Sequence, residues 1–529
     1  MHTSILGDRR RWLKLAAACA TTLWLPRSAW SQTRFSTNPF TLGVASGSPT
    51  HDSVVLWTRL ALPGLFGSGV GREPVVVRWE MAHDDKFTQL VQSGQAQAVV
   101  ELAHSVHVEA TGLEPERWYF YRFMAGDAVS AVGRTRTFAA ADAPAARLRL
   151  AYASCQRWEH GYFSAYRHML QENLDLVLFL GDYIYEYPGA ANAVRTHALG
   201  WTLTLDDYRK RYALHKGEAD LQAMHAACPW LVTWDDHEVH NDYAGIQAGD
   251  SGPAVPDFMA RRAAAYQAFY EHMPVRASVL TRAVAGLSSG AEMRIYSQWR
   301  HGRLANLTLL DARQYKDAQV CTRDARPGSS VVDPAACPAW DDPKRSMLGK
   351  QQEAWLDAQF AAARGNTAWN VVGQQTLFGP RDFSPGAPRR LWNDGWDGYG
   401  AARNRLTDAL RRNAVANPVL LGGDVHENWV GHVKADYADP ASASIGVEFC
   451  GTSISARSDG NARTAEWLAE NPHFVFADGR RKGYGVAEFT PARLTTTLRV
   501  VDDVTRRDTT VETLARFVVQ AGRAVVERA

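Results

Sequence analysis

The sequence predicts a layered α/β domain preceded by a small all-β unit, and three observations support this prediction. From about residue 147 to 510, helical segments alternate with short apolar strands, as expected when helices cover a buried sheet. Residues 40–138 instead hold short segments rich in β-branched and aromatic residues, separated by turn signals. An Ala/Asp/Pro run at 139–146 divides the two regions and is typical of a linker.

The all-β unit, residues 40–138, is similar to a fibronectin-type β-sandwich. A turn sequence, Thr111 to Pro115, precedes Tyr119 and Tyr121 and resembles the turn and tyrosine corner of such sandwiches. The strands predicted in this unit are Ser53–Arg59, Val75–Met81, His107–Ala110 and Trp118–Phe123.

The α/β domain, residues 147–510, is predicted from apolar runs short enough to be strands with both faces buried. The predicted strands are Leu148–Ala153, Leu174–Leu180, Leu231–Trp234, one ending at Thr308–Asp311, Trp369–Gly373, Val419–Gly422, Ile445–Cys450 and Gly485–Phe489. The predicted helices are Tyr162–Glu172, Phe258–His272, Gln351–Ala363 and Arg403–Asn413.

Residues 1–31 are predicted to be a targeting segment rather than part of the fold. The arginines Arg9–Arg11 precede an aromatic residue, leucine and lysine, and the apolar run Leu15–Leu25 is too short to anchor a chain in a bilayer. Small residues before position 32 favour cleavage after Ser31. The pattern resembles a twin-arginine export signal, which implies the twin-arginine translocation machinery as a partner; a plain secretory signal is the alternative.

Charge and hydropathy limit the remaining partners. The formal net charge is +2, so no nucleic-acid-binding surface is inferred. No later stretch predicts a membrane span, and we expect a mature protein that is periplasmic or secreted.

The number of cysteines after the predicted signal is odd, so at least one thiol cannot be part of a disulfide within the chain. Five cysteines remain after the predicted signal. Cys321 and Cys337 flank a polar loop and could pair, whereas Cys228 and Cys450 could form a second pair or remain buried thiols. Cys155 is then without a partner, and a thiol bound to metal would need none.

Metal-capable residues follow the predicted strands just beyond their ends. Because ligands gather at the carboxyl ends of strands in open α/β sheets, residues far apart in sequence can meet there. The residues at these strand ends are Cys155, Asp182, Tyr185, Asp235, Asp236, His237, Asp424 and His426.

Each of these pieces alone has an ordinary structural explanation. Gly181–Asp182 can be a turn, and a cysteine at a strand end is more often a small buried hydrophobe. Four such pieces at strand ends of one domain favour a metal centre instead. Imidazole, phenolate and thiolate suit a transition metal, adjacent carboxylates suit Ca²⁺, and clustered metals clamp a phosphate and activate water.

Five motifs in order then resemble one family. Ala-Ser-Cys-Gln, Gly-Asp-Tyr-Ile-Tyr-Glu, Trp-Asp-Asp-His-Glu, Asp-Ala-Arg-Gln-Tyr and Gly-Gly-Asp-Val-His resemble the alkaline phosphatase D (PhoD-like) family over essentially the whole mature chain. The resemblance implies an αββα metallophosphoesterase-like domain behind the β-sandwich, with Fe³⁺ and Ca²⁺ as cofactors. It implies an exported phosphoric ester hydrolase that uses a metal-activated water or hydroxide.

The resemblance also implies a role for each site residue. His237 would face the substrate phosphate, and Arg313 would contact it, with a structural salt bridge to Asp311 as the alternative. Asp235 and Asn241 are candidates for a second calcium or for supporting the ligands. The implied iron ligands are Cys155, Asp182, Tyr185 and His426, and the implied calcium ligands are Asp182, Asp236 and Asp424.

Several functions remain open at this point. The substrates can be phosphate monoesters, diesters or both, including a phospholipase D-like phosphodiesterase activity. An alternative of another class is a secreted binding protein whose α/β domain is an inactive scaffold. A dead domain would be expected to lose at least one metal ligand, and all of them are present.

Overall fold

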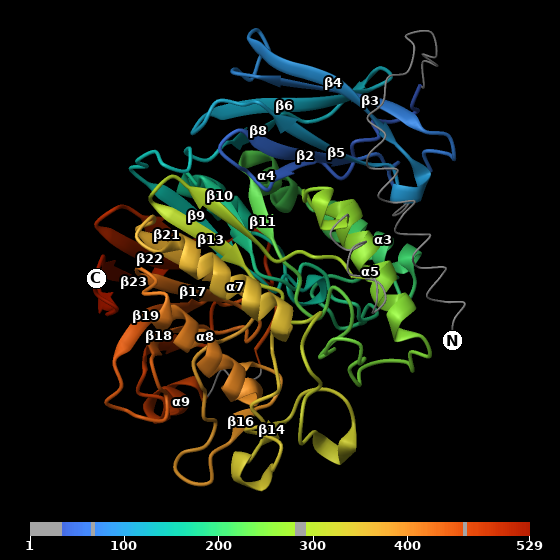
Figure 1. The fold of residues 1–529 in the computed structure, drawn as a ribbon. Coiled ribbons are helices and arrows are strands. Elements are labelled where there is room, and N and C mark those ends of the chain that lie inside the picture. The colour runs from blue at the N-terminus through green and yellow to red at the C-terminus, as the bar shows by residue number, and fades with distance from the viewer. Residues whose placement is uncertain (1–33, 65–68, 281–291, 459–462) are drawn as a thin grey trace.

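The computed structural model describes residues 34–64, 69–280, 292–458 and 463–529. Two large sheets lie face to face, helices cover their outer faces, and a smaller sheet packs at one end (Figure 1). This arrangement confirms the predicted α/β layering behind a β-rich N-terminal region. The predicted signal, residues 1–31, lies outside the described residues.

The first large sheet has ten strands and a parallel centre, where β9, β10 and β11 lie side by side. Its other neighbouring strands pair antiparallel, except for a single parallel contact between β1 and β11. In spatial order the strands are β24 (Glu527–Arg528), β23 (Val511–Gln520), β22 (Arg493–Val501), β21 (Lys482–Phe489), β9 (Leu148–Ala153), β10 (Leu176–Phe179), β11 (Trp230–Val232), β1 (Val44–Gly47), β2 (Ser53–Arg59) and β5 (Ser105–Thr111).

The second large sheet has seven strands, and β13, β15, β17 and β19 run parallel in that order. In spatial order its strands are β12 (Ser297–His301), β13 (Ala305–Leu309), β15 (Trp369–Gly373), β17 (Pro418–Gly422), β19 (Ser444–Cys450), β18 (Asn428–Lys434) and β20 (Phe474–Asp478). A two-stranded ribbon joins β14 (Val331–Val332) to β16 (Leu391–Trp392).

The N-terminal region is divided between two sheets, which the sequence did not predict. Strands β1, β2 and β5 extend the ten-stranded sheet, with Gly47 of β1 paired to Trp230 of β11. The tyrosine corner is present, because the Tyr119 hydroxyl accepts the backbone N–H of Glu114 at 2.9 Å. The separate sheet contains β4 (Leu90–Ala98), β3 (Val75–Ala82), β6 (Trp118–Ala125), β7 (Ala128–Val129) and β8 (Gly133–Arg136).

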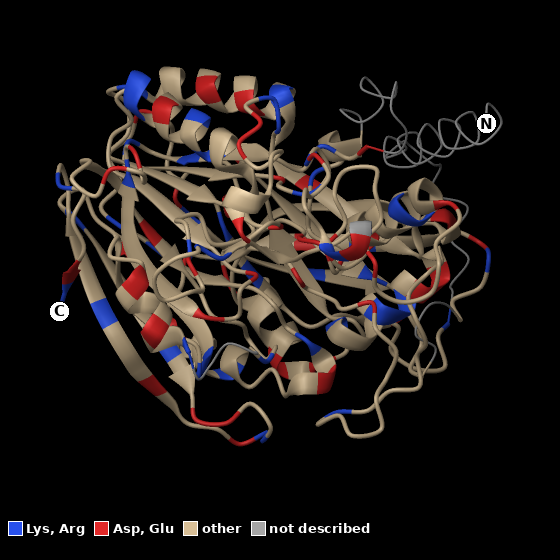
Figure 2. Cartoon of the chain, turned by 90° about the horizontal axis from the view of Figure 1, so that it is seen from below, with Lys and Arg blue, Asp and Glu red and all other residues tan. Residues whose placement is uncertain are grey.

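Charged residues of both signs are interspersed over the chain. Figure 2 shows acidic and basic positions mixed along helices, strands and loops, which agrees with the small net charge. Within the described ranges, no helix combines the length and the apolar character needed to cross a membrane.

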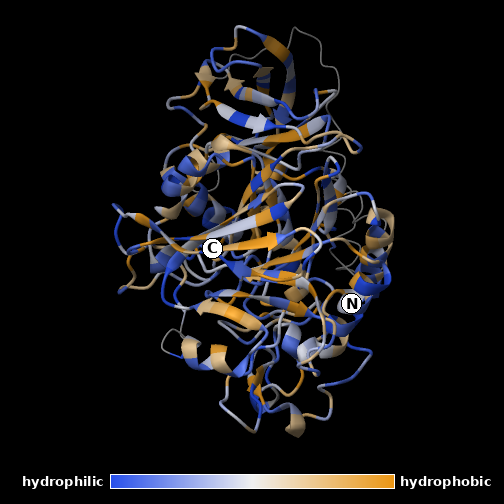
Figure 3. Cartoon of the chain, turned by 90° about the vertical axis from the view of Figure 1, so that its left-hand side faces the viewer, coloured by the Kyte–Doolittle hydropathy of each residue, from blue (hydrophilic) through white to orange (hydrophobic). Residues whose placement is uncertain are grey.

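Figure 3 shows hydrophobic residues along many of the strands. The core around the two large sheets lies in three layers, one between the sheets and one on each outer face. Alternate residues of β9 explain this: Leu148, Leu150 and Tyr152 pack between the sheets, whereas Ala151 and Ala153 face the helices on the other side. The α-helices are α2 (Ala165–Met169), α3 (Leu205–Lys216), α4 (Ala219–Ala227), α5 (Phe258–His272), α7 (Gly349–Ala363), α8 (Gly400–Arg412) and α9 (Thr464–Glu470).

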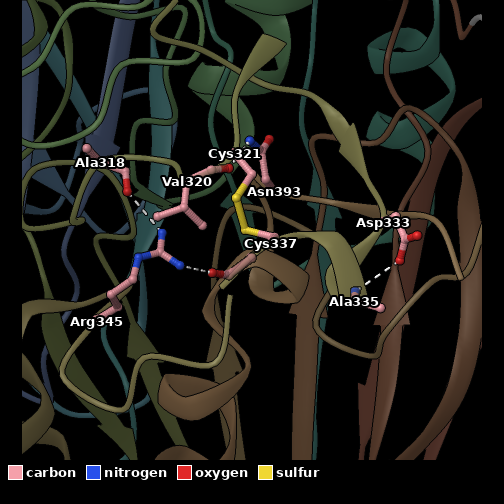
Figure 4. Close-up of a disulfide and its surroundings, with 9 residues drawn as sticks. Ala318, Val320, Cys321, Asp333, Ala335, Cys337, Arg345 and Asn393 are labelled. Carbon is pink, nitrogen blue, oxygen red and sulfur yellow. Dashed lines mark hydrogen bonds between the residues drawn. A yellow bond between two sulfur atoms is a disulfide. The ribbon is translucent and has the colours of Figure 1, made fainter. Parts of the chain in front are cut away.

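The structure settles the cysteine alternatives. Cys321 and Cys337 form a disulfide that closes the loop between them, and Arg345 beside it donates to the Ala318 carbonyl at 2.9 Å (Figure 4). Cys228 and Cys450 are free, buried thiols, as is Cys155.

Candidate metal centre

The ends of four strands bring the predicted residues together. Cys155 follows β9, Asp182 and Tyr185 follow β10, and Asp424 and His426 follow β17 of the other sheet. Because β9 and β10 are adjacent and parallel, their carboxyl ends meet at one edge. The loop after β11 carries Asp235, Asp236, His237 and Asn241 to the same edge.

The backbone at these strand ends is held in an unusual conformation. Four residues here have φ values in the left-handed region, which residues other than glycine rarely adopt. They are Cys155 (60°), Asp182 (57°), Asp424 (66°) and His426 (56°). Such strain persists only where the surrounding structure fixes it, and it is concentrated at functional sites. Four of the predicted ligands share it.

Gly181 allows two of these loops to approach each other. Its φ is +113°, and a Cβ atom built there would lie 2.5 Å from the Cβ of Asp235. A side chain at this position would therefore push apart the loops that carry Asp182 and Asp235.

Cys155, Asp182 and His426 form the first group of candidate ligands. One ligand atom from each lies within 4.8 Å of the others. The Tyr185 hydroxyl is 3.0 Å from a carboxylate oxygen of Asp182 and 3.1 Å from Nε2 of His426. Nδ1 of His426 lies 2.7 Å from the Arg457 carbonyl, which turns Nε2 towards the group.

Asp182 also belongs to a second group, with Asp236 and His237, within the same 4.8 Å limit. Nδ1 of His237 lies 2.7 Å from a carboxylate oxygen of Glu186, so the orientation of the ring is fixed. Asp182 is thus the carboxylate that the two groups share.

A third group contains Asp236 together with Asp242 and Asp394, and neither Asp242 nor Asp394 was predicted from the sequence. Asp242 lies one residue beyond Asn241, in the loop already singled out. Asp394 follows the short strand β16, which is not part of either large sheet, so its sequence position does not mark it as lying at the carboxyl edge of those sheets.

Arg313 lies among these carboxylates. It is 1% exposed, and its guanidinium pairs with Asp235 through Nε, with Asp394 at 2.7 Å and with Asp236 at 3.5 Å. The expected alternative, a salt bridge to Asp311, is wrong in its partner: Asp311 accepts the backbone N–H of Arg313 at 3.1 Å, not its guanidinium.

Asn241 lies at the side of the cluster. Its Oδ1 accepts the Tyr187 hydroxyl at 2.9 Å, and its backbone N–H donates to Glu186 at 2.7 Å. The Arg157 guanidinium lies over the Tyr187 ring, 4.5 Å from its centroid. These contacts join Arg157 and Tyr187 to the loop after β11.

The electrostatics of the cluster favour bound cations. Burial raises the pKa of Asp182 and of Asp424 well above the usual range, and neighbouring carboxylates add to the rise although His237 opposes it at Asp182 and Arg313 opposes it at Asp424. Burial and the nearby Asp182 carboxylate raise the pKa of the Cys155 thiol. A cation in this position would stabilise the ionised form of all three groups.

Unpaired buried oxygens provide a direct test of whether metals fit. Oδ2 of Asp235, Oδ1 of Asp236 and Oδ2 of Asp424 are buried without a hydrogen-bond partner among the described residues. A buried carboxylate oxygen is normally paired, and a metal ion would satisfy these three. The donor set, with one thiol, one phenol, one imidazole and several carboxylates, fits a transition metal beside a harder cation.

The chain is similar to known proteins along nearly its whole length. Residues 150–498 match the family described as PhoD-like phosphatase, and residues 26–139 match its N-terminal domain. Alkaline phosphatase D of Bacillus subtilis (strain 168) is 44% identical over 494 residues, which cover 92% of this chain and 82% of that protein. A solved structure of PhoD is 42% identical, with a TM-score of 0.86, over 94% of this chain and 93% of the other.

Proposed function

Because the chain belongs to the PhoD-like phosphatase family and is a phosphoric ester hydrolase, we propose that it works through a centre of Fe³⁺ and Ca²⁺ bridged by Asp182. The observation that carries this proposal is the membership of Asp182 in two ligand groups at once, one with Cys155 and His426 and one with Asp236 and His237. A carboxylate between two such groups is suited to bridge two cations.

The chemistry of the donors assigns the two cations. Cys155, Tyr185 and His426 would hold iron together with Asp182, because thiolate, phenolate and imidazole suit a transition metal. Asp236 and Asp424 would hold calcium with Asp182, because they supply only hard oxygen atoms. The unpaired oxygens of Asp236 and Asp424 support this second assignment.

Asn241 supports the ligands in this proposal, whereas Asp235 pairs with Arg313 through Oδ1 and keeps Oδ2 for a cation. Asp235 is paired with the guanidinium of Arg313, and Asn241 accepts the hydroxyl of Tyr187. A second calcium is better served by Asp236, Asp242 and Asp394, whose oxygens lie within 4.8 Å of one another. Arg313 and Lys316 already neutralise Asp394, which weakens the attraction of that group for a further cation.

The protein groups have distinct tasks in ester hydrolysis. When bound, the cations would polarise the phosphoryl group and make water a stronger nucleophile near neutral pH. His237, held by Glu186, is in position to donate a hydrogen bond or a proton to a phosphate oxygen. Arg313 holds Asp235, Asp236 and Asp394 in place, and this pairing supports a positioning role more than direct contact with substrate.

The substrate class extends from monoesters to diesters. A phospholipase D-like phosphodiesterase activity stays within the same chemistry, since both reactions displace an ester oxygen at phosphorus. A secreted binding protein with an inactive scaffold has less support, because the candidate ligands come together in the fold with free oxygens between them.

Export is proposed from the N-terminal sequence. Arg9–Arg11 and the apolar run Leu15–Leu25 support recognition by the twin-arginine machinery and a periplasmic or secreted mature protein. That machinery carries folded proteins, which suits an enzyme that binds its metals before it leaves the cytoplasm.

Metal analysis and visible spectroscopy test the proposed centre. The purified protein should contain iron and calcium and should show a charge-transfer band from thiolate and phenolate on Fe³⁺. A colourless, active enzyme that contains only zinc would overturn the iron assignment. Rates on p-nitrophenyl phosphate and bis-p-nitrophenyl phosphate then distinguish monoesterase from diesterase activity.

A further inference from the structure

We propose that Glu238 is a positioning residue for the metal centre. Its buried carboxylate joins the loop after β10 to the loop after β11 and so fixes Asp182 relative to Asp236. In this role Glu238 touches neither substrate nor metal and acts through the backbone of the ligand loops. The inference rests on the proposed centre, in which Asp182 bridges two cations and Asp236 holds calcium.

The carboxylate of Glu238 accepts three backbone N–H groups from two loops. Oε2 accepts the N–H of Asp182 at 3.1 Å and that of Asp235 at 2.8 Å, and Oε1 accepts the N–H of Tyr183. Asp182 and Tyr183 follow β10, whereas Asp235 follows β11, the adjacent parallel strand. One oxygen atom, Oε2, therefore bonds to both loops at once.

These N–H groups lie beyond the paired part of the sheet. β10 ends at Phe179 and β11 at Val232, and Leu180 and Thr233 make the last backbone bonds in line with the two strands. A buried N–H without an acceptor is costly, so the carboxylate takes the place of carbonyls that the sheet no longer supplies. The stretch that it holds begins at Asp182, where the backbone takes up its left-handed conformation.

Glu238 is held in place by a turn of its own loop. The N–H groups of Val239 and His240 both donate to the Asp236 carbonyl, at 2.8 and 2.7 Å. Glu238 is 1% exposed, and within the described residues no basic side chain forms an ion pair with it. A glutamate buried without such a partner is rare, and its hydrogen bonds here are those to the two loops.

The loops that Glu238 joins carry ligands of both proposed cations. Asp182, on the first loop, belongs to two ligand groups, and Asp236, on the second loop, belongs to one of these. A carboxylate can bridge two cations only if its loop stays in a fixed position relative to the other ligands. Groups that orient metal ligands without touching the metal typically change its affinity 10- to 100-fold, and we expect an effect of about this size from Glu238.

Calcium titration of the full-length, iron-loaded protein tests the proposal. Glu238→Gln keeps the shape of the side chain, but one terminal atom becomes an N–H donor that faces a backbone N–H. The dissociation constant for calcium should rise about 10- to 100-fold. The visible charge-transfer band should lose intensity or change wavelength, because Asp182 is held less firmly beside the Tyr185 hydroxyl.

The kinetics of Glu238→Gln distinguish a positioning role from contact with substrate. Saturating calcium should restore most of kcat on p-nitrophenyl phosphate, and KM for this substrate should stay at the wild-type value. A KM that remains raised at saturating calcium would place Glu238 at the substrate and overturn the proposal.

Glu448→Gln is the matched control, because Glu448 is another buried acid whose carboxylate accepts backbone N–H groups. It is 1% exposed, bonds to Phe378 and Gly379, and belongs to none of the ligand groups. This variant should melt at a lower temperature than the wild type, yet bind calcium with wild-type affinity and keep the wild-type spectrum. An equal loss of calcium affinity in both glutamine variants would show a general structural effect and overturn the proposal.

Folding and the proposed centre are checked separately. If the melting curve shows that Glu238→Gln does not fold, Glu238→Asp replaces it with the same expectation, since its carboxylate is one methylene too short to reach both loops. A folded Glu238 variant with wild-type calcium affinity and spectrum would overturn the positioning role and leave the proposed centre intact. A wild type that binds neither iron nor calcium would instead overturn the proposed centre, and this inference with it.

Discussion

Nδ1 of His237 lies 2.7 Å from one carboxylate oxygen of Glu186, and the other oxygen of Glu186 accepts the backbone N–H of Asn241 at 2.7 Å. Glu186 is fully buried, so this contact is shielded from water. The contact joins the loop after β10 to the loop after β11. Glu186 contacts only Nδ1 of His237, so Nε2 remains available to a substrate and the orientation of the ring is fixed.

Replacing Glu186 with glutamine should therefore lower turnover. Burial lowers the pKa of His237, but Glu186, Asp236 and Asp182 together raise it well above its usual value. Without the charge on Glu186, less of the imidazole is protonated and its orientation is weaker. Glu186→Gln should reduce kcat on p-nitrophenyl phosphate by about 10- to 100-fold, with a smaller change in KM.

The pH profile separates this effect from a general structural defect. In Glu186→Gln, the part of the kcat–pH profile in which His237 loses its proton should move to lower pH, since the neutral amide no longer stabilises the imidazolium. Glu466→Gln, an exposed change on α9, should leave kcat unchanged. An unaltered profile in Glu186→Gln would argue against a role for this pair in the reaction.

Asp182→Asn tests the bridging carboxylate. An amide is a poor bridge because only one of its atoms is an oxygen. Iron and calcium content should both fall, and kcat should drop by at least about 100-fold. Asp408→Asn, at an exposed position, is the matched control and should retain both metals. Full metal content and full activity in Asp182→Asn would show that Asp182 is not a metal ligand.

Arg313 should matter for stability as well as for activity. Arg313→Met leaves Asp235 buried without its cation and Asp394 with Lys316 alone, which should cost about 3–5 kcal/mol in the free energy of unfolding. Arg389→Met removes an arginine that is 60% exposed from its pair with Asp382, and should cost no more than about 1 kcal/mol. Chemical denaturation of the metal-free proteins measures both. Similar losses in the two variants would contradict the structural role of Arg313.

Much of the α/β fold was predictable because its strands are apolar on both faces. Ser53–Arg59, Leu148–Ala153, Trp369–Gly373 and the helix Phe258–His272 have the same bounds in sequence and structure. The helix predicted at Tyr162–Glu172 is shorter in the structure, where α2 covers only Ala165–Met169 and a 3₁₀ turn follows it. Its first residues are used elsewhere, since the Tyr162 N–H donates to the Val504 carbonyl.

Helix α3 was not predicted, and its buried face explains why. That face includes Arg211, His215 and Lys216 beside two tyrosines, so the sequence lacks an apolar stripe at helical spacing. The sharing of β1, β2 and β5 with the ten-stranded sheet was also missed. It depends on a pairing between Gly47 and Trp230, far apart in sequence, which no local pattern encodes.

The site was predictable where it follows the rule of parallel strand ends. Cys155, Asp182 and Asp236 follow adjacent parallel strands, so their proximity is a consequence of topology. Asp394 follows the minor strand β16 and reaches the cluster only through tertiary packing. The partners of Arg313 were likewise hidden, because Asp235 and Asp394 are 78 and 81 residues away.

The disulfide should stabilise the protein by restricting the unfolded chain. Cys321 and Cys337 are 16 residues apart, and closing a loop of this length contributes roughly 3 kcal/mol. The double variant Cys321→Ser/Cys337→Ser should unfold at lower denaturant concentration by that amount. Reductant should destabilise the wild type but not the double variant. Equal sensitivity of both proteins to reductant would show that the effect arises elsewhere.

Glu159 should make stability depend on pH in the acid range. It is 3% exposed and contacts His197 at 2.7 Å, Arg157 at 3.5 Å and Arg211 at 3.8 Å. Burial alone would raise its pKa, but the hydrogen bond from His197 and the two arginines lower it from 4.5 to about 2. A carboxylate with a depressed folded-state pKa stabilises the protein above its unfolded pKa, and this stabilisation is lost as the pH falls.

Between about pH 5 and pH 2, the wild type should therefore lose roughly 3 kcal/mol more of its unfolding free energy than Glu159→Gln does. The glutamine variant should be less stable at neutral pH, because it keeps the burial cost without the charge interactions. Urea unfolding of both proteins across this pH range measures the difference, with the exposed change Glu470→Gln as control. Parallel pH curves for the wild type and Glu159→Gln would show that Glu159 keeps its ordinary pKa in the folded protein.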